Sequence, residues 1–140
     1  MTIPLENGYR LEERTPSPED YCRLRAAAGL SPKSVEAARR GLPGTFYGVV
    51  AVRGGEVVGM GRVVGDGALF LQIVDIAVLP EHQGRGIGKA IVRALVEHIR
   101  RAAPPGTHVS LLADGPAKHL YAQFGFRETG PVTVGMAFKV

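Results

Sequence analysis

A glycine-rich segment, Gln83-Gly-Arg-Gly-Ile-Gly-Lys89, has the residue types that point most directly to chemistry. It follows a long apolar run and opens the longest amphipathic segment, so its backbone N–H groups converge where a helix is predicted to begin. Three glycines at alternate positions, with Arg85 and Lys89 beside them, exceed what a tight connection from strand to helix requires. The segment is therefore predicted to bind an anion such as a phosphate.

Two well-known phosphate motifs do not fit this segment. The dinucleotide fingerprint is Gly-x-Gly-x-x-Gly, but here the three glycines are followed by Lys89 and Ala90. The P-loop requires glycine at the position of Gln83 and serine or threonine at the position of Ala90. A dinucleotide oxidoreductase and a P-loop nucleotide hydrolase are both disfavoured.

Asp75 is the one ionisable residue between Leu69 and Leu79, inside an otherwise apolar run. A carboxylate in such a place either transfers a proton or binds a cationic amine, or else it accepts hydrogen bonds from a nearby turn or helix. The sequence leaves these readings open. The four histidines form no His-x-x-x-His pair and Cys22 is the only cysteine, so no metal site is predicted.

The elements that must position these residues follow from turn signals and periodicity. Gly54-Gly55 joins two valine-rich runs, the composition of a two-residue hairpin turn. Apolar residues recur every fourth position from Ile87 to Ile99, which indicates an amphipathic helix. We predict strands over 8–14, 46–53, 56–64, 68–78, 107–112 and 132–139, and helices over 18–28, 31–40, 89–102 and 116–123, in the order β-α-α-β-β-β-α-β-α-β.

Composition sets broad limits on the class of protein. The 140 residues are 45% hydrophobic and 21% charged, which predicts one folded domain over 1–140. The net charge of +4 favours an anionic partner, but 6% aromatic residues and no tryptophan argue against nucleic acid. A single cysteine, no apolar run that could cross a membrane and no signal peptide predict a cytoplasmic protein without a membrane partner.

Two motifs in order resemble the GNAT family of acetyl-CoA-dependent N-acetyltransferases. The first is Gln-x-x-Gly-x-Gly, read at Gln83, Gly86 and Gly88; the second runs from Asp114 to Tyr121 in Asp-Gly-Pro-Ala-Lys-His-Leu-Tyr, followed by Gly-Phe. The segments 59–67 and 112–114 are also similar to a small bacterial and plant branch that includes arylalkylamine acetyltransferases. The resemblance implies an α/β (α+β) fold whose mixed sheet of six to seven strands is flanked by about four helices.

By this resemblance, the glycine-rich segment would hold the pyrophosphate of acetyl-CoA, and the central strand would pair with the pantetheine arm. The backbone N–H of Ile76 would then face the thioester carbonyl. Asp114 stands where the family commonly has asparagine, so the amide donor to the pantetheine arm is lost. The cofactor-binding residues implied in this way are Ile76, Ala77, Val78, Gln83, Gly84, Arg85, Gly86, Ile87, Gly88, Lys89 and Asp114, with no metal.

The resemblance also implies the chemistry. Tyr121 lies where the family places its general acid, although a tyrosine packed on the sheet is the alternative reading. Gln72 occupies a position that often carries a glutamate base, which leaves Asp75 or a chain of waters to accept the proton. The implied function is transfer of the acetyl group to a primary amine of a small molecule or peptide by direct attack in a ternary complex, by a monomer or homodimer. The alternative is a non-catalytic acyl-CoA sensor of the same fold.

Overall fold

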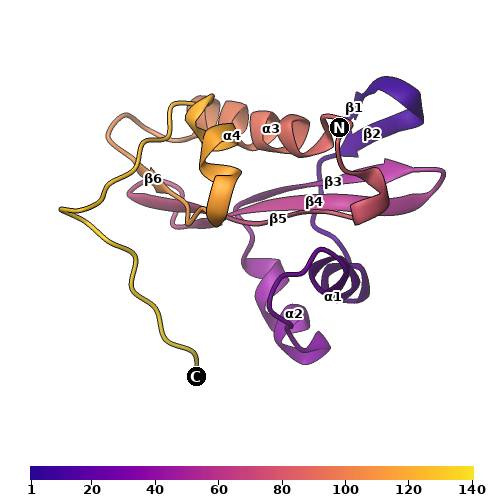
Figure 1. Cartoon of the computed structure of the whole chain (residues 1–140), viewed down its shortest axis with the longest axis horizontal. Coiled ribbons are helices and arrows are strands. Elements are labelled where there is room, and N and C mark those ends of the chain that lie inside the picture. The colour runs from indigo at the N-terminus through magenta and orange to yellow at the C-terminus, as the bar shows by residue number, and fades with distance from the viewer.

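The computed structural model describes residues 1–140 and contains a six-stranded mixed sheet with strand order β1-β2-β3-β4-β5-β6. Neighbouring strands are antiparallel except β5 and β6, which are parallel. Helices α3 and α4 lie on one face of the sheet, and α1 and α2 lie on the other (Figure 1). The strands are β1 (Thr2–Pro4), β2 (Tyr9–Glu12), β3 (Tyr47–Arg53), β4 (Glu56–Gly65), β5 (Phe70–Val78) and β6 (His108–Ser110), and the helices are α1 (Pro18–Ala27), α2 (Val35–Gly41), α3 (Ile87–Ala102) and α4 (Lys118–Ala122).

The predicted hairpin and the strand after it are confirmed. Gly54 and Gly55 take φ values of 56° and 81°, the left-handed conformations that a two-residue turn between β3 and β4 requires. Strand β5 lies between β4 and β6, and helices cover both faces of the sheet around it. This placement explains why its sequence is apolar at both odd and even positions.

A serine side chain caps each of the first two helices. Ser17 accepts a hydrogen bond from the Asp20 N–H and caps α1. The second helix begins at Val35, later than the predicted start at Ser31, because Ser34 is the residue whose side chain caps it. The apolar stripe of α3 is buried against the sheet, as its periodicity predicts; its four repeating members are Ile87, Ile91, Leu95 and Ile99.

The predicted last strand, Val132–Lys139, is wrong for this structure. The segment after Gly130 belongs to no strand and its side chains are exposed, while a short additional strand, β1, pairs with β2 at the opposite edge of the sheet. The alternating pattern identified a segment suited to one buried face, but it carries no information about which strand would pair with it. Six strands and four helices therefore form in the order β-β-α-α-β-β-β-α-β-α.

No helix of the structure combines the length and hydropathy needed to cross a bilayer.

Candidate functional site

The last two strands of the sheet diverge and open a gap between them. Strand β6 pairs with β5 over three residues only, from Phe70 to Gln72, and β5 then continues to Val78 without a neighbour on that side. The Leu79 N–H donates to the Val58 carbonyl on β4 at 2.9 Å. Because backbone groups alternate along a strand, those of Val78 point to the free side, and those of Ala77 point to β4.

A β-bulge shapes the free side of β5. Met60 pairs with Ala77 and Arg62 pairs with Val74, so the two residues Asp75 and Ile76 stand opposite the single residue Gly61. Asp75 takes a φ of 60°, a left-handed conformation that aspartate tolerates better than most residues. Its side chain is thereby turned toward the face of the sheet that carries α1.

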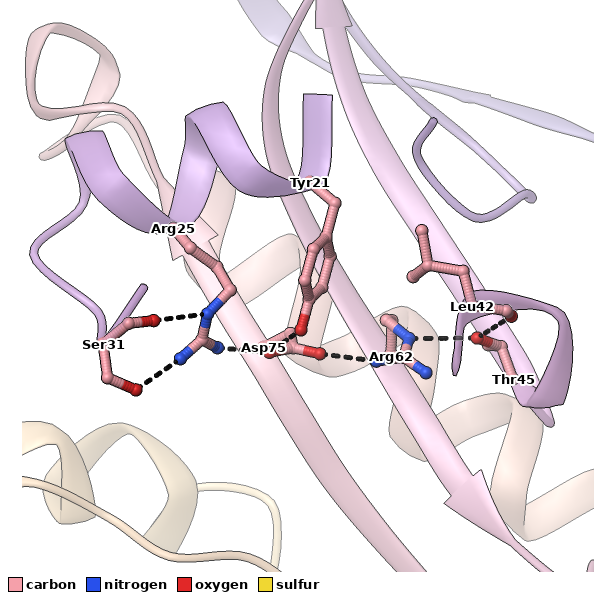
Figure 2. Close-up of polar contacts among 7 residues, drawn as sticks. All are labelled: Tyr21, Arg25, Ser31, Leu42, Thr45, Arg62 and Asp75. Atoms are coloured by element: carbon pink, nitrogen blue, oxygen red, sulfur yellow. Dashed lines mark hydrogen bonds and ion pairs between the residues drawn. The ribbon is translucent and has the colours of Figure 1, made fainter. Parts of the chain in front are cut away.

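Asp75 lies at the centre of a buried polar cluster (Figure 2). One carboxylate oxygen accepts from the Tyr21 hydroxyl at 3.0 Å and from Arg25 Nη1 at 2.5 Å, and the other accepts from Arg62 Nη1 at 2.7 Å. The side chains of Arg25 and Arg62 are 10% exposed and that of Asp75 is 6% exposed. Burial, followed by the charge of Asp75, raises the pKa of Tyr21. The contacts observed for Asp75 are those of a hydrogen-bonded ion cluster between strand and helix.

Secondary contacts hold both guanidinium groups in place. Arg25 donates to the carbonyl and to the hydroxyl of Ser31, each at 2.9 Å. Arg62 donates through Nε to the Thr45 hydroxyl at 2.9 Å, and Thr45 donates to the Leu42 carbonyl. The cluster therefore ties α1, the loop after it, and the segment before β3 to the bulge on β5.

The gap between β5 and β6 contains a cavity of about 230 Å³. Tyr121 of α4 and Asp114 line it together with Asp75 and Ile76 of β5, so four of the predicted site residues share one cavity. Burial, with a smaller contribution from the charge of Asp114, raises the pKa of the Tyr121 hydroxyl above its ordinary value. The hydroxyl is consequently protonated at neutral pH.

Arg25 also lines this cavity and is not among the residues predicted from the sequence. No local motif marks it, because it is one of several arginines in the chain and lies 50 residues before Asp75. It lies on the same face of α1 as the buried Tyr21, and the burial of this face becomes visible only once α1 is packed on the sheet.

The glycine-rich segment lies at the other end of the free side of β5. Gly84 and Gly86 take φ values of 76° and 78°, and open space surrounds both positions where a side chain would begin. Gly86 is the N-cap of α3 and has no side chain to bond the first N–H groups of the helix, which remain available to an anion. Ile87 is buried and anchors the helix start, whereas Arg85 and Lys89 are exposed beside it.

Gln83 connects this segment to β5. Its side-chain amide donates to the Val78 carbonyl at 2.9 Å, on the free side of the strand. The glycine-rich segment, the stretch of β5 without a neighbouring strand and the Tyr121 cavity thus follow one another along one side of the sheet. No group of three or more histidine, cysteine, aspartate or glutamate side chains is arranged to hold a metal ion.

Residues 44–128 match a family model described as "Acetyltransferase (GNAT) domain". Among solved structures, a protein of unknown function from meticillin-resistant Staphylococcus aureus, SA2161, described as a probable acetyltransferase, is 43% identical with a TM-score of 0.90, and the alignment covers 94% of this chain and 99% of that one. Among curated proteins, GCN5-related N-acetyltransferase 2, chloroplastic, of Arabidopsis thaliana is 37% identical over 71 residues, which are 51% of this chain and 27% of that protein.

Serotonin N-acetyltransferase 2, chloroplastic, of rice is 31% identical over 84 residues, which are 60% of this chain and 41% of that protein. The chain therefore matches less than half the length of these curated relatives. The family model covers more than half of the chain, and the fold agrees with that of the staphylococcal protein over nearly all of both chains. The chain belongs to the GNAT family of acetyltransferases.

Proposed function

We propose that this protein transfers the acetyl group of acetyl-CoA to a primary amine by direct attack in a ternary complex. The observation that carries the proposal is the cavity between β5 and β6, which Tyr121 lines together with the bulge residues Asp75 and Ile76 of β5. The relatives named as acetyltransferases support the reaction class, and the acceptor is a small-molecule or peptide amine.

The chain offers a place for each part of the acyl donor. Free N–H groups at the start of α3 and the charges of Arg85 and Lys89 suit the pyrophosphate. The stretch of β5 after Gln72 has no neighbouring strand on that side and suits the amide-containing arm, which binds there as an added strand would. Acetyl-CoA supplies the activated acetyl thioester.

The bulge has a direct consequence for the reacting carbonyl. Residues 75 and 76 both stand opposite Gly61, so the ladder to β4 is interrupted where the free side of β5 enters the cavity. We assign the Ile76 N–H to the thioester oxygen, where a fixed backbone donor stabilises the negative charge that develops during attack.

Tyr121 is proposed to be the general acid. The departing thiolate needs a proton, and a tyrosine whose pKa is raised by burial holds that proton throughout the neutral range. Asp114 lines the same cavity and its negative charge also favours the protonated hydroxyl.

For Asp75 we propose a positioning role. Three donors already surround its carboxylate, two of them guanidinium groups, so its oxygens are directed at Tyr21, Arg25 and Arg62. A carboxylate held in this way fixes the bulge and the helix α1. The acceptor amine then loses its proton to water in the cavity.

The test measures thiol release from acetyl-CoA with a panel of primary amines, for the natural chain and for Tyr121→Phe. Loss of the acid is expected to lower kcat by about 10²–10⁴-fold with little change in KM for acetyl-CoA. Tyr47→Phe is the matched control, since it also removes one tyrosine hydroxyl, but one that donates to Glu13 outside the cavity. It is expected to stay within a few-fold of the natural chain.

Turnover that survives Tyr121→Phe would remove that residue from the acid role while keeping the reaction. Binding of CoA without turnover of any amine would favour a non-catalytic acyl-CoA sensor. Failure to bind CoA, measured by calorimetry, would refute the proposed function.

A further inference from the structure

The C-terminal tail, residues 131–140, carries an apolar pattern that its own domain leaves uncovered. Every second residue is a large apolar one, and these side chains are from 64% to 123% exposed; they are Val132, Val134, Met136, Phe138 and Val140. The residues between them are small or polar. Alternation of this kind is typical of a strand with one buried face, and a chain rarely leaves so large an apolar face in water.

The same molecule has an open sheet edge. Strand β6 is the last strand of the sheet, and it pairs only with β5. Its other side presents unpaired N–H and C=O groups, the arrangement to which a further strand adds.

A hollow with both polar and apolar lining residues lies beside that edge. A cavity of about 370 Å³ is enclosed by the end of α3, by β6 and by the segment after α4, with Val96, Ile99, Val109, Phe124 and Phe126 among its walls. A strand added to β6 would bring alternate side chains over this hollow, on the face where Val109 points. Large apolar residues of such a strand, such as Met136 and Phe138, would then contact the apolar part of the hollow's lining.

The tail is directed away from its own β6. The Thr133 N–H donates to the Thr129 carbonyl at 3.0 Å, and the Thr129 hydroxyl donates to the Thr133 carbonyl at 3.1 Å, so a closed turn sets the direction at its start. The tail passes Leu112, where a Cβ at Gly135 would lie 3.0 Å from the leucine side chain. It then runs outward and ends well clear of the sheet (Figure 1).

We propose that two copies of this chain exchange their tails, so that the tail of each copy adds as a strand to the β6 edge of the other. Each copy has both an exposed tail and a free β6 edge that can accept one. The contact is therefore self-complementary, and a two-fold axis closes it. The exchange is independent of the proposed function.

The area available is sufficient for a stable dimer. Each large apolar side chain contributes roughly 60–120 Å² of apolar surface. With both tails and the surfaces they cover, five such residues per tail account for on the order of 1,200–2,400 Å², against about 1,200–2,000 Å² for a stable interface. The exchange also places a partner's strand next to Leu111 and Leu112, which line the Tyr121 cavity.

The first test is the mass of the full chain by light scattering. We expect twice the 14.9 kDa of one chain, and we expect the monomer mass for the double variant Met136→Lys, Phe138→Lys, which places charges on the apolar face. Lys139→Ser, on the other face of the same segment, is the control and should stay dimeric. These side chains are exposed within one copy, so the variants should keep their folded circular dichroism. A monomeric natural chain, or a double variant that stays dimeric, would overturn the proposal.

The second test separates exchange from folding back. In a Cys22→Ser background, one copy carries Ser110→Cys on β6 and a differently tagged copy carries Thr133→Cys, Gly135→Cys or Ala137→Cys on the tail. A disulfide between the two tags supports exchange. A chain carrying both cysteines that cross-links only within itself shows the tail on its own β6 and refutes the proposal.

Discussion

Replacing Asp75 by asparagine tests the buried polar cluster most directly. The change removes one negative charge and keeps the size of the side chain. It also keeps the backbone conformation, because asparagine tolerates a φ of 60° at least as well as aspartate. Arg25 and Arg62, each with a side chain 10% exposed, then lose their only counter-ion.

The expected cost follows from this burial. Breaking a buried ion pair by removing one partner costs about 3–5 kcal/mol, because a charge remains in a poorly solvated site. With a urea dependence of about 1–3 kcal/mol per molar, the midpoint of unfolding should fall by roughly 1–5 M. Asp75→Ala should cost about 1–2 kcal/mol more, since alanine adds the penalty for a left-handed conformation.

Equilibrium urea unfolding followed by circular dichroism measures the loss of stability in Asp75→Asn and in Asp75→Ala. Glu81→Gln is the control, because it removes the same charge from an exposed residue that forms no ion pair, and it should shift stability by less than about 0.5 kcal/mol. A loss below about 1 kcal/mol for Asp75→Asn would show that the two arginines do not depend on the carboxylate. The account of α1 docking on the bulge would then be refuted.

Three further changes have distinct expected outcomes. In Gly61→Ala the new Cβ would lie 2.5 Å from Ile91 Cγ2, so we expect a loss of about 1–3 kcal/mol in urea unfolding. An unchanged midpoint would show that α3 does not pack tightly on Gly61. His98 stacks on Tyr47, and burial, followed by the charge of Arg101, lowers the pKa of the His98 imidazole. The folded chain therefore binds a proton at His98 less tightly than the unfolded chain does. Stability should therefore decline as the pH falls below about 6.5, and His98→Phe should remove this dependence in urea titrations at pH 7.5 and 5.5. Because the pKa of Tyr121 is raised, kcat should show no decline from loss of its proton below about pH 10, and a pH–rate profile with a limb near 8 that vanishes in Tyr121→Phe would contradict this.

Much of the architecture follows from local rules that act within a few residues. Gly54-Gly55 marks a hairpin because few other residues take a positive φ, and Ser17 before Pro18 marks a helix start. The repeat from Ile87 to Ile99 reveals the buried face of α3. The glycine-rich segment before α3 can likewise be read from the sequence, since a helix N-terminus with free N–H groups needs no distant partner.

Other features depend on residues far apart in the chain. The pattern in residues 132–139 predicts a strand, but a strand needs a neighbour, and within one copy the segment has none. The bulge on β5 depends on the register with β4, in which Asp75 and Ile76 stand opposite Gly61. No sequence pattern around Asp75 predicts it.

The sequence alone determined the reaction class that this chain resembles and the end of the sheet at which an anion would bind, because glycines and helix starts act locally. Only the tertiary structure shows what surrounds the carboxylate at position 75. Its partners, Tyr21, Arg25 and Arg62, come from a helix and a strand that meet only when α1 packs on the sheet. A buried charge is defined by what surrounds it, and those surroundings form only on folding.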